Sequence, residues 1–260
     1  MPNNQLPDTL LIWLIFLFTI VLLWLADEAG YRMGGWVQSR WPDRAEVGVG
    51  TLVGASLALL GFMLAFITGI EINLLLTRFD LVVSEANAIE STYHKTVFLE
   101  EPIASESRDL LREYVDLRLK ALEPENREMA IQRSEHIQQE LWKKAVVGTQ
   151  QNPTPIVALY ISALDAMTDL HVSRVNYELE IRVPPIIVVG LYIMGALTLV
   201  LIGVHGSYTG KRNLMALIGM ILILSMVFIL VVDLDRTNQG LIRIPQTALI
   251  NLQQQLQMYP

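Results

Sequence analysis

The sequence predicts an all-α membrane protein with four transmembrane helices and a large helical insert between the second and the third. Apolar residues make up 52% of the 260 residues and charged residues only 17%, a balance too apolar for a soluble protein of this size. Four apolar runs are long enough to cross a bilayer. The charged residues gather between the second and third runs, which divides the chain into membrane, polar and membrane parts.

The four apolar runs occupy residues 10–26, 47–70, 184–204 and 214–232. A helix of about 20 residues crosses a hydrocarbon core of about 30 Å, so each run can form one span. We expect the first run to be a retained helix rather than a signal peptide, because residues 1–9 contain no Lys or Arg and because Trp13 and Trp24 resemble interfacial anchors. Residues 27–46 and 205–213 are then short linkers on the side opposite the insert.

The polar insert carries the net charge of the chain. It contains 12 of the 19 Lys and Arg and 19 of the 26 Asp and Glu, so its formal charge equals the −7 of the whole protein. We expect a helix from about residue 50 to 99, about 75 Å long at 1.5 Å per residue, to continue the second span into the insert. Three more helices are expected, from a cap at Ser105 or Ser107 to residue 122, over 127–147 and over 154–180. The predicted division is 1–70 (spans one and two), 71–183 (insert), 184–232 (spans three and four) and 233–260 (C-terminal tail).

The sequence contains no motif that indicates enzymatic catalysis. There is no Cys, and none of the four His residues (His94, His136, His171 and His205) stands at metal-pair spacing. No Gly-rich phosphate loop or nucleophile elbow occurs. We therefore expect no catalytic residue, no metal site and no cofactor. The acidic insert also argues against a nucleic-acid partner, because phosphate contacts need clustered Lys and Arg.

The second span has a stripe of small residues along one face. At 100° per residue this stripe is flanked by Phe62 and Phe66, and its members are Gly54, Ala58, Gly61, Ala65 and Gly69. Small residues allow helices to approach closely in lipid, so the stripe can be a packing seam within the chain's own bundle. Alternatively, Ala58, Phe62 and Phe66 face the axis of a ring of subunits and form an apolar neck that gates ions by dewetting.

Charged residues stand outside the spans rather than within them, which argues against a proton-coupled or ion-coupled transporter. Arg78 and Asp80 follow the second span, where they can form a charged ring at a pore mouth or reach the interface by snorkelling. Asp233, Asp235 and Arg236 follow the fourth span and are interpreted as an interfacial charge cluster. Two insert groups can bind a cation, line a conduit, or form ordinary interhelical salt bridges and solvated faces; they are Glu85, Asn87 and Glu90, and Asp165, Asp169, His171 and Arg174.

Three stretches, residues 61–92, 110–119 and 231–245, resemble the bestrophin-like membrane family, a bacterial group related to bestrophin ion channels. The resemblance implies four spans, a large helical cytosolic part between spans two and three, and five subunits around a pore lined by span two. It assigns neck roles to Phe62 and Phe66 and a basic-aromatic motif to Arg78 and Phe79, although Ala58 replaces a bulky neck residue. Some bestrophins bind calcium after span four, but two aspartates are too few for six to eight oxygen ligands.

These observations predict an oligomeric ion channel whose apolar neck is formed by transmembrane helix two. The expected partners are the lipid bilayer, further copies of the chain in a homo-oligomer of five subunits, and small inorganic ions. The resemblance places the channel in the bacterial cytoplasmic (inner) membrane, with the insert and both termini in the cytoplasm; the charges near the spans do not decide the orientation. The alternative is a membrane-anchored helical scaffold or sensor without ion conduction.

Overall fold

A computed structural model describes residues 8–41, 48–151, 154–179, 181–210, 212–236 and 242–258. The regular structure of these residues is entirely helical, which confirms the all-α fold class. In chain order the elements are α1 (Asp8–Arg40), α2 (Val49–Lys95), the short 3-10 helix η2 (Thr96–Phe98), α3 (Ile103–Lys120), α4 (Arg127–Gln151), α5 (Val157–Leu179), α6 (Pro185–Thr209), α7 (Leu214–Asp235) and α8 (Thr247–Met258).

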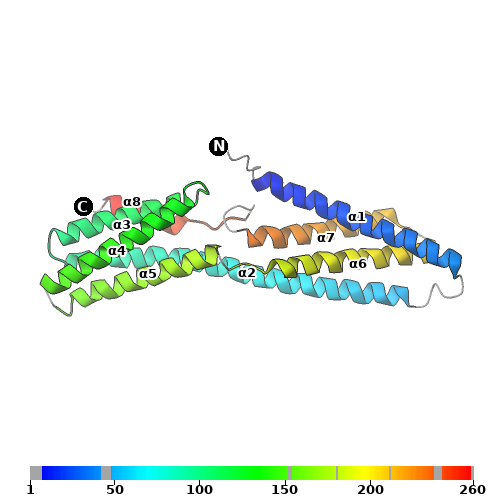
Figure 1. Cartoon of the computed structure of the whole chain (residues 1–260), viewed down its shortest axis with the longest axis horizontal. Helices are drawn as coiled ribbons and strands as arrows, with labels where there is room; N and C mark the ends of the chain where they lie inside the picture. The colour runs from blue at the N-terminus through cyan, green and yellow to red at the C-terminus, as the bar shows by residue number, and fades with distance from the viewer. Residues whose placement is uncertain are drawn as a thin grey trace. The chain divides into compact units, whose positions relative to one another are not determined.

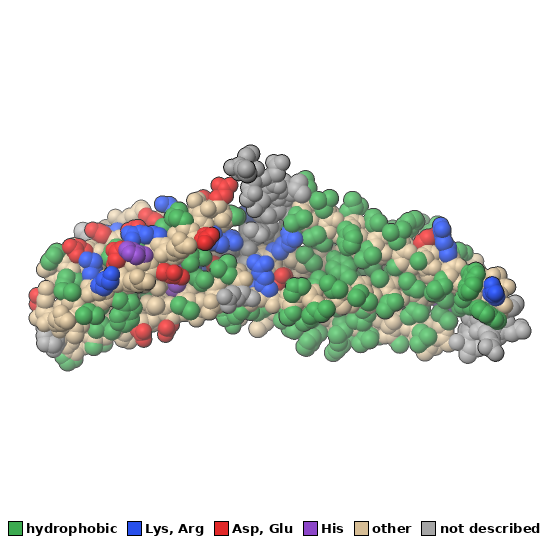
Figure 2. All heavy atoms as spheres, in the orientation of Figure 1, with side chains coloured by type: hydrophobic (Ala, Val, Ile, Leu, Met, Phe, Trp, Pro, Cys, Tyr) green, Lys and Arg blue, Asp and Glu red, His purple; other side chains and the backbone are tan. Residues whose placement is uncertain are grey.

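Four of these helices, α1, α2, α6 and α7, are long and apolar enough to cross a membrane, as predicted. The chain forms two compact units. The membrane unit consists of Met1–Leu74 and Arg182–Arg243, and the insert unit consists of Leu75–Ile181 and Ile244–Pro260. Hydrophobic side chains cover the visible face of the membrane unit, whereas Lys, Arg, Asp and Glu gather on the insert unit (Figure 2).

Within the membrane unit, α1 packs along α6 and also contacts α7 (Figure 1). Thr19 shares a hydrogen bond of 2.9 Å with the Tyr192 hydroxyl, and further along both helices Gly30 lies against the backbone of Val200. Because the residue numbers rise together, α1 and α6 run parallel. Gly203 allows a similarly close approach, since a Cβ at this position would lie 2.1 Å from the carbonyl oxygen of Asp27.

The first helix continues well past its predicted end. Residues 27–40, expected to belong to a linker, are helical and pack on α6. Asp27 is 2% exposed, and its Oδ2 accepts a 2.6 Å hydrogen bond from Arg212. Arg212 also donates to Glu28 Oε2 at 2.8 Å and lies 4.8 Å from the centre of the Tyr31 ring. The prediction that a linker begins at residue 27 is wrong. Asp27 and Glu28 stay within the helix because Arg212, in the α6–α7 connection, compensates their charges.

The insert unit has one hydrophobic core, to which the second half of α2 and the helices α3, α4, α5 and α8 contribute. Among its fully buried residues are Ile89, Leu111, Ile137, Leu164 and Leu249. The helix α3 begins at Ile103, and its N-cap residue is Pro102 without a side-chain hydrogen bond, so the predicted Ser105 or Ser107 cap is wrong.

The last helix, α8, lies in the segment expected to be a C-terminal tail. Its Leu249, Leu252 and Leu256 are buried in the core of the insert unit. Polar contacts fix the same helix to α3, because Arg112 donates from Nε to the carbonyl oxygen of Leu256 at 3.0 Å and Gln253 donates to Asp116 at 2.7 Å. The amphipathic α8 is therefore an integral part of the insert unit.

Candidate functional site

One face of α2 in the membrane unit is left uncovered by the residues that the structure describes. The phenyl rings of Phe62 and Phe66 are 62% and 57% exposed and stack on each other with their centroids 6.4 Å apart. The opposite face is packed, since Leu60, Leu64 and Ile67 are at most 5% exposed. The helix therefore presents two aromatic rings, one turn apart, on the side that faces away from its own bundle.

The small-residue stripe lies on the same uncovered side. Ala58 is exposed, and a Cβ built on Gly54, Gly61 or Gly69 would meet no atom within 4 Å. Within the described residues of one chain, this stripe is not a packing seam. The close contacts of the membrane unit are made instead by glycines of α1 and α6. Small residues on such a face allow the backbone of another helix to approach closely.

The side chains of Arg78 and Asp80 lie in different surroundings. Arg78 is 2% exposed; it donates from Nε to the carbonyl oxygen of Tyr177 at 3.0 Å and from Nη2 to that of Ile181 at 2.7 Å. These carbonyls belong to the end of α5 and the residues after it, where a cation complements the helix dipole. Asp80 and Phe79 are exposed. Arg78 is therefore buried and Asp80 exposed, although the sequence suggested that both contribute to one charged ring.

The acidic residues after the fourth span bind backbone amides. Asp233 is 4% exposed, and its Oδ2 accepts a 3.0 Å hydrogen bond from the amide of Ile242. Asp235 Oδ1 accepts one of 3.2 Å from the amide of Val183, while Arg236 is half-buried. Among the residues that the structure describes, no group of three or more His, Asp or Glu could hold a metal ion.

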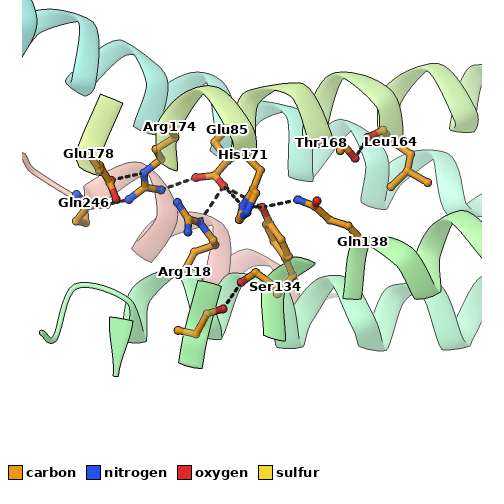
Figure 3. A network of polar contacts seen from close by, with 12 residues as sticks. Glu85, Arg118, Ser134, Gln138, Leu164, Thr168, His171, Arg174, Glu178 and Gln246 are labelled. Atoms are coloured by element: carbon orange, nitrogen blue, oxygen red, sulfur yellow. Dashed lines mark hydrogen bonds and ion pairs between the residues drawn. The ribbon is translucent and has the colours of Figure 1, made fainter. Parts of the chain in front are cut away.

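A buried polar network occupies the centre of the insert unit (Figure 3). Glu85 on α2 is fully buried between two guanidiniums, Arg118 from α3 and Arg174 from α5. Arg118 Nε lies 2.9 Å from Glu85 Oε1, and Arg174 forms an ion pair with the other oxygen. Arg174 also donates to Glu178 at 2.8 Å and to the Gln246 side chain at 3.0 Å. Burial alone would lower the pKa of Arg174, but the two carboxylates raise it above its usual value.

Tyr114 and His171 complete the network. The Tyr114 hydroxyl donates to Glu85 Oε1 at 3.0 Å, lies 2.8 Å from His171 Nδ1, and accepts a 3.3 Å hydrogen bond from Gln138. Burial and the negative charge of Glu85 raise the pKa of Tyr114 well above its usual value, so the hydroxyl keeps its proton. The network joins α2, α3, α5 and the Gln246 segment by ion pairs and charge-assisted hydrogen bonds, and α4 by the neutral hydrogen bond from Gln138.

Neither of the two groups of insert residues that the sequence suggested forms a site as a whole. Glu85, His171 and Arg174 enter the buried network, whereas Asn87, Asp165 and Asp169 are exposed. The side chain of His171 is only 2% exposed. Arg118 was missed altogether. A signal was present, since Arg118 follows Leu111, Tyr114 and Val115 at helical spacing on an apolar face.

Comparison with known proteins identifies the family and the fold. Residues 13–249 match the family model described as Bestrophin-like domain. A crystal structure of a point mutant of a bacterial bestrophin homologue from Klebsiella pneumoniae has 14% identity and a TM-score of 0.66, covering 93% of this chain and 97% of that chain. A second structure of a bestrophin homologue from this organism has 14% identity and a TM-score of 0.65, covering 96% and 100%. No curated protein matches the chain.

Proposed function

The chain belongs to the bestrophin-like family, and from this membership together with the geometry of α2 we propose that it is an oligomeric ion channel. One observation carries the proposal: the face of α2 with Ala58, Phe62 and Phe66 is uncovered while the opposite face is packed. When several copies surround an axis, this face of each copy turns inward. The phenyl rings then form two stacked apolar constrictions separated by one helical turn.

An apolar neck of this kind gates by hydration. Hydrated ions do not cross a narrow apolar ring, because water leaves it and the ion would lose its shell; a wider ring fills with water and conducts. The uncovered Gly54, Gly61 and Gly69 support close contact between neighbouring copies of α2, since small residues are favoured where helices meet in lipid. We propose five copies, the number expected from the family resemblance.

The proposed setting is the bacterial cytoplasmic membrane, with the insert and both termini in the cytoplasm. The four apolar helices support an integral membrane protein, and their even number leaves both termini on the side of the insert. The proposed functional division remains 1–70, 71–183, 184–232 and 233–260. The partners are lipid, further copies of the chain and small inorganic ions. We propose neither an enzymatic activity, nor a cofactor, nor a nucleic-acid partner.

A liposome flux experiment tests the neck. Replacing Phe62 and Phe66 together by Ala removes both ring constrictions, so the passive flux of ions from liposomes containing the purified protein should rise. The matched control is Phe18→Ala on α1, a ring that is 60% exposed and lies outside α2. Flux that stays at the wild-type level in a well-folded double variant contradicts the neck assignment.

The mass of the detergent-solubilised particle separates the channel from a membrane-anchored scaffold. A ring of five copies of the 29.3 kDa chain is expected, and its axis should be continuous. A monomer or a two-fold dimer with packed spans would instead support a scaffold or sensor in which the spans only hold the insert unit.

A further inference from the structure

A partly open cavity of about 290 Å³ lies at the end of the membrane unit where α6 passes into α7. Its lining comes from α1, α6, α7 and the connection between α6 and α7, all of which belong to one compact unit. Two glycines of α6, Gly203 and Gly206, form part of the wall. A Cβ built on Gly206 would lie 3.9 Å from the Tyr31 ring, an ordinary van der Waals contact. The lack of side chains on these glycines therefore helps to leave the space open.

The lining of this cavity changes from polar to apolar along the helices. Thr209, Arg212 and Asn213 lie at the connection between α6 and α7. Ile202 on α6 and Met220 on α7 lie further inside the spans, and Ile202 is seven residues, or about 10 Å, from Thr209. In a bilayer the end of a span lies at the boundary between headgroups and hydrocarbon. The cavity therefore suits a molecule with one polar and one apolar part.

The polar part of the lining contains one charge of each sign. Among the described residues that line the cavity, Asp27 and Arg212 are the only Asp, Glu, Lys or Arg, so the lining has no net formal charge. Arg212 donates from Nη2 to Asp27 Oδ2 and from Nη1 to Glu28 Oε2. Its Nε is buried and has no hydrogen-bond partner within the described part of the chain. The same holds for Oδ1 of Asp27, whose side chain is 3% exposed. One cationic donor and one anionic acceptor thus remain for a ligand.

We infer that this cavity binds the phosphoethanolamine headgroup of a membrane phospholipid. The ammonium group of the lipid donates to Asp27 Oδ1, and its phosphate accepts from Arg212 Nε, which gives two charge-assisted hydrogen bonds. The helix α7 begins directly after its N-cap residue Asn213, and the positive end of the helix dipole favours the phosphate further. The first part of one acyl chain lies along the apolar lining formed by α6 and α7.

The neutral lining distinguishes this headgroup from other phospholipid headgroups. Phosphatidylglycerol has a phosphate without an amine, so it would add an uncompensated negative charge beside Asp27. Phosphatidylcholine carries the same charges as phosphatidylethanolamine, but its quaternary ammonium has no N–H to donate to the carboxylate. Free phosphoethanolamine matches the polar groups and leaves the apolar lining unused. Only phosphatidylethanolamine among these satisfies both parts of the cavity. The inference depends on the membrane spans and is independent of ion conduction.

Native mass spectrometry of the purified full-length protein tests the inference. The protein in detergent is incubated with equal amounts of dioleoyl phosphatidylethanolamine, phosphatidylcholine and phosphatidylglycerol, and the lipid retained per chain is measured. The wild type should retain phosphatidylethanolamine about tenfold better than either other lipid, the ratio that one hydrogen bond to a charged group supplies. Equal retention of the three lipids overturns the inference. Displacement of the lipid by an equal concentration of free phosphoethanolamine assigns the cavity to a soluble ligand and overturns the lipid assignment.

Two variants assign the lipid to this cavity. Gly206→Leu places a side chain in the cavity and should lower the retention of phosphatidylethanolamine about tenfold. The matched control is Gly190→Leu on the same helix, because Gly190 does not line the cavity and a Cβ there meets no atom within 4 Å. Asp27→Asn leaves the charge of Arg212 in excess within the lining, so the preference should move to phosphatidylglycerol.

Elution at the wild-type volume on size exclusion shows that each variant has folded. Undiminished retention in Gly206→Leu, or an unchanged lipid preference in Asp27→Asn, overturns the inference. The lipid preference of the wild type tests it without any substitution.

Discussion

Arg118 Nε lies 2.9 Å from Oε1 of Glu85, and both side chains are buried to within 1% of completely. The two residues are on different helices, α3 and α2, and Arg174 from α5 takes the other carboxylate oxygen. Two guanidiniums thus share one carboxylate inside the insert unit. Removing a charge from such a site leaves its partners buried without compensation, which costs far more than loss of a surface pair.

Glu85→Gln is therefore expected to destabilise the insert unit by about 3 to 5 kcal/mol, the range found when one member of a buried ion pair is removed. Arg118 and Arg174 both lose the carboxylate with which they pair. Denaturant unfolding of the full chain in detergent, followed by circular dichroism, measures the change. Asp109→Asn is the control, because Asp109 is 75% exposed in its pair with Arg112 and should matter by about 1 kcal/mol or less. Equal effects of the two variants would contradict the buried pairing.

Gly203→Ala is expected to disrupt the contact between α1 and α6. The added methyl would lie 2.1 Å from the Asp27 carbonyl oxygen and 2.6 Å from the amide nitrogen of Tyr31, so the helices must separate. Gly190→Ala, on the same helix, adds a methyl with no atom within 4 Å. The thermal unfolding temperature in detergent should fall for the first variant and stay near the wild-type value for the second. Similar temperatures for both would show that the close approach is absent.

Leu249→Ala tests whether α8 is part of the insert unit. Leu249 is fully buried, and truncation of such a core leucine costs about 2 to 5 kcal/mol. The neighbouring Ile250 is 43% exposed, so Ile250→Ala should cost much less. Hydrogen exchange of α3 and α8 in the full chain reports the difference, with faster exchange in Leu249→Ala alone. Equal protection in the two variants would show that α8 does not contribute to the core.

The free energy of unfolding at alkaline pH should depend on the ionisation of Tyr160. Burial raises its pKa to about 12, against about 10 in an unfolded chain. The folded state therefore holds this proton more tightly, and the associated stability is fully present below about pH 10 and is lost as the pH rises from about 10 to about 12. For one group with this shift the loss is about 2 to 3 kcal/mol. Unfolding measured across this range should show a smaller fall in Tyr160→Phe, and an equal fall would contradict the assignment.

Most of the fold follows from local patterns. Continuous apolar runs identify the four spans, and the lack of Gly and Pro after Gly69 predicts the uninterrupted α2. The length of α1 was not predictable in this way, because Asp27, Glu28 and three glycines are typical of a linker. They are helical because Arg212, distant in sequence, compensates both acids, and because Gly30 and Gly34 fit against α6. Such compensation depends on tertiary structure that local patterns do not contain.

The candidate sites also include some features that local sequence patterns predict and others that depend on tertiary structure. Helical spacing was sufficient to group Ala58, Phe62 and Phe66 on one face, and their role in a neck stays a prediction. Helical spacing could not predict that Arg78 is buried and Asp80 exposed. The guanidinium of Arg78 is buried because it donates hydrogen bonds to carbonyl oxygens at the end of α5 and just after it. Likewise, residues 85, 118 and 174 come together only when three helices pack, so the buried network was not identified as a unit.

The position of α8 has a consequence for the order in which the protein is made. The core of the insert unit is built from residues 75–181, but Leu249, Leu252 and Leu256 belong to it as well. A ribosome finishes these leucines only after α6 and α7 have been synthesised. The core of the insert unit therefore stays incomplete, with part of its apolar surface exposed, until α6, α7 and α8 have been synthesised.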